Sequence, residues 1–336
     1  MFFHRYSNVK FLYNIFQYYK RAVLYNNPKL SILLFSTQFV PEYGLKTGVF
    51  YSIFHSVSAF CNAGFDILGE FSSLTSYNSN AVVILVASAL IIIGGLGFTV
   101  WNELYTTKSI KRISLHAKMV ILVTAVLIIG GTILMFVFEH NNPNTMAEMS
   151  VVDKIMNSFF ASVTPRTAGF NSIPTDGMTT AGKFLTIILM FIGGSPGSTA
   201  GGIKTTTIGI VFITVLCVIR GREDSEVFKK RFNKDLVYRA FTLIFIGFIL
   251  VVSVTMLLSY TEKGASFISL LYETVSAFGT AGLTIGLTTK LSTIGKILII
   301  FMMYLGRVGP LTVALSLTKK KVNPGIKYPE GKILIG

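Results

Sequence analysis

Residues 58–65 read SAFCNAGF, and two similar stretches follow them: VTPRTAGF at 163–170 and SAFGTAGL at 276–283. All three carry Ala-Gly followed by an apolar residue, and their glycines lie 105 and 113 residues apart. That spacing is too long for a solenoid repeat. Each stretch stands between membrane-length apolar segments, so the pattern indicates repeated units that surround one axis.

The composition indicates an integral membrane protein. Hydrophobic residues make up 51% of the 336 residues and charged residues only 13%, with a mean hydropathy of +0.63. A soluble domain carries about a quarter charged residues. A net charge of +15 also suits nucleic-acid binding, but the basic residues fall between apolar segments, as in multi-pass proteins. A multi-pass protein of the cell membrane, with no nucleic-acid partner, is therefore expected.

Several apolar segments are long enough to cross about 30 Å of hydrocarbon. Four are continuous and run over roughly 80–100, 117–138, 237–260 and 294–318. A fifth is broken into 184–192 and 207–219 by a glycine-rich stretch at 193–204. Irregular backbone at this depth is tolerated only where it is buried in protein or lines water.

A shorter, partly apolar segment precedes each Ala-Gly stretch. These segments of about 14 residues cannot span and fit re-entrant pore helices; they cover 47–60, 151–163 and 264–278. Each unit therefore reads as outer helix, pore helix, Ala-Gly loop and inner helix. The inner helices repeat too, with glycine motifs at 94–97, 193–197 and 306–309.

Basic residues predict the sidedness of the protein. They gather in the loop around Lys111, in the loop 220–239 and in the tail beginning at Lys319. All three emerge on one side if each unit crosses the membrane twice, so that side is expected to be cytoplasmic. The Ala-Gly loops are then expected to face outside.

Taken together, these motifs resemble the Trk/Ktr/HKT superfamily of potassium transporters, and within it the membrane subunit of Ktr-type bacterial systems. The resemblance runs from about residue 31 to residue 336. It implies an all-α membrane fold with four helix–pore helix–filter loop–helix units around a pseudo-symmetric pore. Three units are visible, and only 30–40 is apolar where the second unit's outer helix should stand. The chain is therefore expected to be an N-terminally truncated member that lacks the first unit.

The resemblance also divides the chain. Residues 1–30 form a basic aromatic segment of unclear fold, expected to rest on the lipid surface. The remaining parts are a partial second unit at 31–112, a third unit with a broken inner helix at 113–222, a fourth unit at 223–318 and a cytoplasmic tail at 319–336.

The three Ala-Gly loops are predicted to form a K⁺ selectivity filter. Backbone carbonyls replace the hydration shell of the ion, and glycine adopts the φ values that aim a carbonyl at an axis. Ordinary helix-packing glycines, which are frequent in membrane proteins, explain one such loop but not its recurrence. The predicted filter residues are Asn62, Ala63, Gly64, Thr167, Ala168, Gly169, Thr280, Ala281 and Gly282.

The stretch 193–204 is predicted to be a gate. A nucleotide P-loop is excluded because Ile203 separates Gly202 from Lys204, and a plain linker does not stand between two half-spans. Arg307 lies inside an apolar span, where an arginine costs roughly 2.5–3.5 kcal/mol, so it is expected to bond carbonyls of this stretch. Lys204 is either a second cation there or an interfacial lysine. The predicted gate residues are Gly193, Gly194, Ser195, Pro196, Gly197, Ser198, Thr199, Ala200, Gly201, Gly202, Lys204 and Arg307.

Other polar residues near the loops have supporting roles. Arg166 is expected to stabilise the filter from behind. His55, Asp66 and Glu273 lie near the filter mouths, where capping or mouth electrostatics is favoured over metal binding because no ligand cluster supports a metal. No constellation for nucleophilic or acid–base catalysis occurs, so the chain is not expected to be an enzyme.

The predicted function is potassium uptake through a carbonyl-lined filter with an intramembrane gating loop. No directly bound cofactor is expected; K⁺ is the transported ion, and coupling to Na⁺ is left open. The resemblance implies a homodimer bound to a cytoplasmic regulatory ring that binds nucleotides. The alternative is a non-transporting truncated fragment of such a transporter.

Overall fold

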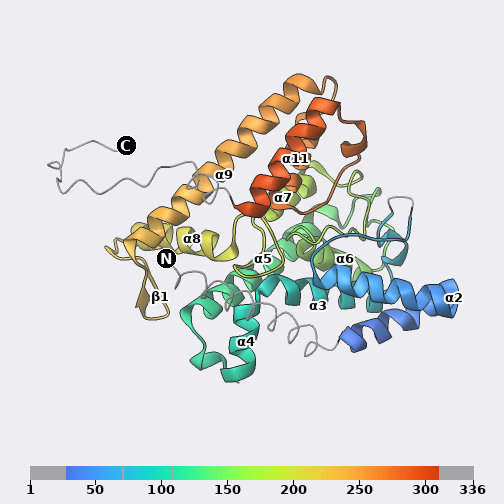
Figure 1. Cartoon of the computed structure of the whole chain (residues 1–336), viewed down its shortest axis with the longest axis horizontal. Helices are drawn as coiled ribbons and strands as arrows, with labels where there is room; N and C mark the ends of the chain where they lie inside the picture. The colour runs from blue at the N-terminus through green and yellow to red at the C-terminus, as the bar shows by residue number, and fades with distance from the viewer. Residues whose placement is uncertain (1–27, 70–71, 108, 310–336) are drawn as a thin grey trace, which may run out of the picture.

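A computed structural model describes residues 28–69, 72–107 and 109–309. Nearly all of the predicted segment 1–30, the predicted tail 319–336 and the end of the expected span 294–318 lie outside the described residues. The described part is mostly helical (Figure 1). Its long helices are α2 (Pro28–Phe60), α3 (Ala81–Leu96), α4 (Phe98–Thr107), α5 (Leu115–Glu139), α6 (Val151–Val163), α7 (Thr180–Phe191), α8 (Thr205–Ile219), α9 (Lys234–Thr261), α10 (Phe267–Gly279) and α11 (Thr293–Val308). Its short elements are η1 (Thr75–Tyr77), η2 (Ile110–Arg112), η3 (Thr288–Lys290), β1 (Glu226–Val227) and β2 (Lys230–Arg231).

Within the described residues, two unbroken helices are long and apolar enough to cross a membrane: α5 with 25 residues and α9 with 28. They confirm the spans expected at 117–138 and 237–260. The broken span is also confirmed, because α7 and α8 are short apolar helices on either side of the glycine-rich stretch. In α11 the helix continues to Val308, the next-to-last described residue of the chain.

The continuous span expected at 80–100 is wrong only at its end, from residue 97 onward. Helix α3 ends at Leu96, and α4 leaves it at an angle of 94°. Gly97 joins them with φ +90°, and a Cβ built on it would lie 2.6 Å from the Pro196 carbonyl oxygen. The Phe98 amide donates to the Gly197 carbonyl at 3.1 Å. The helix therefore turns where the glycine-rich stretch of the third unit packs against it, a contact that hydropathy does not report.

Helix α2 contains both an outer and a pore helix. Gly44, with φ 78° and ψ 166°, interrupts it, so the part before Gly44 begins at Pro28 and is longer than the eleven apolar residues expected. Its polar Gln38 has a structural role, because the Asn80 side chain donates a hydrogen bond to the Gln38 side chain at 2.8 Å. The second part of α2 ends at Phe60, as predicted for a pore helix, and α6 and α10 confirm the other two predicted pore helices.

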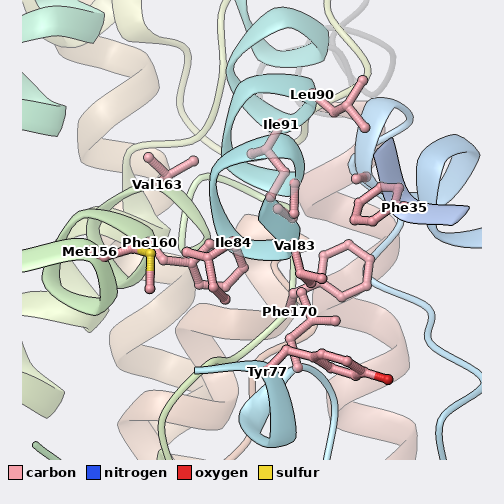
Figure 2. Close-up of a cluster of buried hydrophobic side chains, with 14 of the residues drawn as sticks. Phe35, Tyr77, Val83, Ile84, Leu90, Ile91, Met156, Phe160, Val163 and Phe170 are labelled. Carbon is pink, nitrogen blue, oxygen red and sulfur yellow. The ribbon is translucent and has the colours of Figure 1, made fainter. Parts of the chain in front are cut away.

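Neighbouring units share their packed cores. Figure 2 shows the cluster in which Phe35 of α2, Ile84 of α3 and Phe160 of α6 surround Phe170, the residue that ends the second loop stretch. All four side chains are almost completely buried. Lipid offers little hydrophobic driving force between helices, so close packing holds such units together. A second cluster joins α7, α9, α10 and α11 in the same way.

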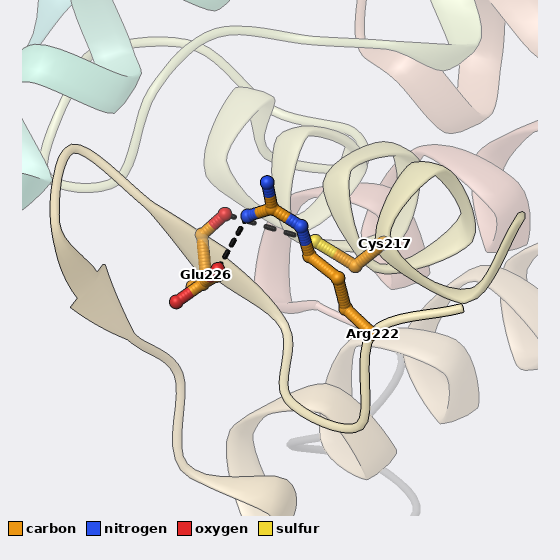
Figure 3. A network of polar contacts seen from close by, with 3 residues as sticks. All are labelled: Cys217, Arg222 and Glu226. Carbon is orange, nitrogen blue, oxygen red and sulfur yellow. Dashed lines mark hydrogen bonds and ion pairs between the residues drawn. The ribbon is translucent and has the colours of Figure 1, made fainter. Parts of the chain in front are cut away.

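The basic loop expected at 220–239 contains an ordered hairpin, which projects from the place where α8 meets α9 (Figure 1). Its strands β1 and β2 are antiparallel, with Glu226 opposite Arg231. Arg222 forms an ion pair with Glu226, and the Cys217 thiol at the end of α8 donates to the Glu226 carbonyl at 3.7 Å (Figure 3). These contacts hold the hairpin against the end of α8.

Candidate functional site

The three predicted filter loops share one backbone form. Each contains two residues with positive φ that are separated by one alanine. The pairs are Asn62 and Gly64, Thr167 and Gly169, and Thr280 and Gly282, with φ between 49° and 84°. Positive φ is uncommon for residues other than glycine. Three independent occurrences of the same pair therefore show that the sequence repeat is also a repeat of backbone geometry.

The loops meet one another directly, and the glycines of the first two loops face the loop that follows. A Cβ built on Gly64 would lie 2.3 Å from the carbonyl oxygen of Ala168. A Cβ built on Gly169 would lie 2.5 Å from the carbonyl oxygen of Ala281. At Gly282 the nearest atom to such a Cβ is the Gly169 Cα, 3.9 Å away. The second loop thus lies between the first and the third, and their backbones approach more closely than any side chain permits.

A hydroxyl at the end of each pore helix closes its loop. It donates to the carbonyl of the apolar residue that follows the loop glycine. The three bonds are Ser58 to Phe65 at 2.7 Å, Thr164 to Phe170 at 2.5 Å, and Ser276 to Leu283 at 2.6 Å. These hydroxyls are not among the predicted filter residues, although Ser58 and Ser276 occupy the same place in two of the repeated stretches.

The repeated glycines of the inner helices lie against the pore helices. A Cβ on Gly94 would come within 2.0 Å of the Phe60 carbonyl oxygen, and one on Gly306 within 1.9 Å of the Phe278 carbonyl oxygen. Phe60 and Phe278 occupy equivalent positions in their repeats. Both glycines are therefore required by a close approach of backbones, and the inner helices support the loops from the side of the gate stretch.

The glycine-rich stretch 193–204 lies between two inner helices. The Ser195 amide donates to the Gly95 carbonyl of α3 at 3.0 Å, and the Gly202 amide donates to the Gly306 carbonyl of α11 at 3.3 Å. A Cβ on Gly201 would lie 2.2 Å from the Thr280 hydroxyl oxygen. All predicted gate residues other than Arg307 lie in this stretch, which connects α3 to α11 and touches the fourth unit's loop.

Two cations bond adjacent carbonyls of this stretch. The Arg307 Nη1 donates to the Thr199 carbonyl at 2.6 Å, which confirms the contact expected for Arg307. The Lys204 Nζ donates to the Ala200 carbonyl, also at 2.6 Å. Of the two readings left open for Lys204, the contact agrees with a second cation at the stretch. Charge-assisted hydrogen bonds are about twice as strong as neutral ones, so both contacts hold the backbone in place.

The supporting residues lie behind and beside the loops. Arg166 is buried, and its Nη2 lies 3.4 Å from the Thr124 hydroxyl of α5. Buried Glu273 accepts hydrogen bonds from the hydroxyls of Thr284 and Thr288, the latter at 2.7 Å. Glu273 therefore caps the chain that leaves the fourth unit's loop, as expected for one of the capping residues.

His55 and Asp66 also have local structural partners. The His55 Nδ1 lies 2.8 Å from the carbonyl of Tyr51 in its own helix. The Asp66 carboxylate accepts from the Leu68 amide at 3.3 Å, which is a capping turn. Neither residue is brought to the three loop glycines by these contacts.

A set of side-chain hydrogen bonds between the outer and inner helices is not predicted by the sequence patterns. In each unit a polar residue at the end of the outer helix bonds the residue that caps the following inner helix. The pairs are Gln38 with Asn80, Glu139 with Thr179, and Glu262 with Ser292. The Ser292 hydroxyl and amide, which donate to Glu262, hold the pKa of that carboxyl below its usual value. The available signal was an acidic residue at the end of the two long outer helices.

Comparisons with known proteins agree with this geometry. The family described as "TrkH: Cation transport protein" matches residues 19–324. The chain is 47% identical over 308 residues to the potassium/sodium uptake protein NtpJ of Enterococcus hirae, covering 90% of this chain and 67% of that protein. It is 38% identical over 307 residues to the Ktr system potassium uptake protein B of Bacillus subtilis, covering 91% and 68%.

A solved structure shares the fold. The potassium transporter TrkH from Vibrio parahaemolyticus superimposes with a TM-score of 0.68 at 18% identity, covering 86% of this chain and 62% of that one. The chain thus spans about two thirds of the length of these relatives. The family match over most of the chain, together with relatives of this identity, shows that the chain belongs to the TrkH family of cation transport proteins.

Proposed function

We propose that this chain forms the ion-translocating part of a K⁺ uptake protein of the cell membrane. The observation that carries the proposal is the direct contact of the loops, with Gly64 against the Ala168 carbonyl and Gly169 against the Ala281 carbonyl. Rings of backbone carbonyls are how proteins take the place of the hydration shell of K⁺. The relatives named above as potassium or potassium/sodium uptake proteins support the same function and leave Na⁺ as a second candidate ion.

In this proposal the nine loop residues from Asn62 to Gly282 form the filter, and the stretch 193–204 with Arg307 forms the gate. The support for the gate is that the stretch bridges two inner helices and lies against Thr280 of a filter loop. Small residues dominate it, so it can move without displacing large side chains. No bound cofactor is needed, since the fixed carbonyls and the two cations supply the electrostatics.

We assign the cytoplasmic side to the loops around Lys111 and Arg231, which carry the excess of lysine and arginine. The three units are 31–112, 113–222 and 223–318. With this sidedness, their filter loops face outside. A cysteine introduced at Lys111 is expected to react with a membrane-impermeant maleimide only after the cells are opened. Labelling of this cysteine in intact cells would reverse the assigned sidedness.

We also propose two partners that the family resemblance implies: a second copy of the chain and a cytoplasmic nucleotide-binding ring. The Bacillus subtilis relative is named as part of a Ktr system. Exposed Lys229, Lys230 and Arg231 on the hairpin offer a basic surface to such a ring. Light scattering of the purified chain, with and without the ring subunit, measures both associations.

Uptake in cells tests the proposed function. Expression in a bacterial strain that lacks its own K⁺ uptake systems is expected to restore growth at limiting K⁺, and purified protein is expected to gain thermal stability from K⁺, because an ion that binds only the folded state stabilises it. Folded protein in the membrane that neither supports growth nor binds K⁺ would favour a non-transporting fragment.

A further inference from the structure

A small cavity lies behind the loops of the third and fourth units. Its volume, counted as the space open to the centre of a water-sized sphere, is about 20 Å³. Residues from both units line it, among them Asn171 and Ser172 just after one loop, Leu283 just after the other, and Tyr272 of the pore helix α10. The cavity therefore borders the backbone that leaves two of the proposed filter segments.

Two hydroxyls on residues that line this cavity have no hydrogen-bond partner in the described part of the chain. They belong to Ser172, which is 1% exposed, and Tyr272, which is 0% exposed. Eight buried side-chain atoms in the described part of the chain are without a partner, and these two are the ones among them that border the cavity. Buried hydroxyls are costly to leave unbonded, and in folded proteins they are almost always satisfied by protein or by ordered water.

The other hydroxyls around the cavity already donate hydrogen bonds to backbone carbonyls. Thr164 donates to the Phe170 carbonyl, and Thr186 to the Gly182 carbonyl of its own helix at 2.8 Å. Thr175 donates to the Thr284 carbonyl at 2.5 Å, which is a direct bond from the third unit to the fourth. Ser172 and Tyr272 bond none of these neighbours, and a ligand inside the cavity would supply the missing partner of both hydroxyls.

We propose that the cavity is a binding site for one ordered water molecule, which joins the Ser172 hydroxyl of the third unit to the Tyr272 hydroxyl of the fourth. The volume suits one water, for which about 10–15 Å³ of such space is needed, and two or more polar partners are required. Organic ligands need pockets of about 300 Å³ or more, and a K⁺ ion needs a shell of several oxygens. The water is a second link between units, beside the Thr175 bond.

This link bears on selectivity, and that part rests on the proposed filter function. The water fixes Ser172 and Tyr272, and Ser172 follows the loop of Gly169 by three residues. A filter loop that can move apart from its neighbour loses the fixed spacing of carbonyls on which discrimination between ions depends. Tyr272 and Ser172 are thus positioning residues that act on the loops through a bound water.

The site is tested on the purified protein, without transport. Tyr272→Phe and Ser172→Ala each remove one partner of the water and are expected to lower the melting temperature by about 2 °C. The double variant is expected to lose about the same amount as either single variant, because both changes break one bridge. Thr186→Val is the matched control: its hydroxyl bonds its own helix, so its effect is expected to add to that of Tyr272→Phe.

Additive losses for Tyr272→Phe and Ser172→Ala would overturn the bridge, and so would a high-resolution density map in which the cavity holds no water. In a transporting protein, Tyr272→Phe is further expected to reduce the ratio of K⁺ to Na⁺ uptake about five-fold. If the melting temperatures show coupling but no variant transports, the water site stands and the proposed function fails. If transport is selective for K⁺ and the decreases in melting temperature are additive, the proposed function stands and the water site fails.

Discussion

Replacing Gly169 by alanine is expected to lower the ratio of K⁺ to Na⁺ uptake at least about ten-fold. Two penalties coincide at this residue. Its φ of +84° is costly for any residue with a Cβ, by about 1–2 kcal/mol. The Cβ would also lie 2.5 Å from the Ala281 carbonyl oxygen, so the loops of the third and fourth units must move apart. About 1.4 kcal/mol corresponds to a factor of ten.

The expected loss of discrimination between K⁺ and Na⁺ can be compared across the three loop glycines. Gly64→Ala is expected to match Gly169→Ala, since its Cβ would meet the Ala168 carbonyl oxygen at 2.3 Å. Gly282→Ala, and likewise Gly282→Ser, is expected to weaken discrimination less, because it carries the φ penalty with no contact closer than 3.9 Å. Gly130→Ala on α5 meets nothing within 4 Å and is the control. Equal selectivity of the Gly169 and Gly130 variants would remove Gly169 from the filter.

Deleting residues 195–200 is expected to raise K⁺ flux about ten-fold or more, because it removes the backbone that bridges α3 and α11. The deletion takes away Ser195, which bonds Gly95, and Thr199, which accepts from Arg307. Hydrogen bonds to charged groups contribute about 1.5–3 kcal/mol each. Arg307→Ala alone is therefore expected to raise flux through the same element. Rates of ion uptake into proteoliposomes at matched protein content are the measurement.

The effects of the deletion and of Arg307→Ala on K⁺ flux are expected not to be additive. In the deletion background Arg307→Ala should add little, since its carbonyl partner is already absent, and contacting groups share one free-energy contribution. Lys204→Ala is expected to behave in the same way because its partner, Ala200, is also deleted. Lys296→Ala, an exposed basic residue on α11, is the control for loss of charge. Effects of the deletion and of Arg307→Ala that multiply would show two separate elements.

Much of the site's chemistry was predictable from the chain because it is local. The break between α7 and α8 was visible as glycine inside an apolar segment, and the loop glycines Gly64, Gly169 and Gly282 all have the positive φ that their residue type favours. The Arg307 contact with the Thr199 carbonyl was also anticipated. A guanidinium inside an apolar span must find acceptors, and the interrupted helix nearby leaves carbonyls free.

Apolar length and glycine placement act within a few residues of each position, so the helical membrane class, the pore helices and the three repeated loops can be predicted from the sequence. Three other features emerge only in the folded chain: the Ala168 carbonyl faces Gly64, α3 turns by 94° beside Pro196, and Glu139 accepts hydrogen bonds from Thr179. These contacts join residues some 40 to 100 positions apart. Hydropathy and local periodicity carry no information on which distant backbones will meet, and packing between whole units settles that choice.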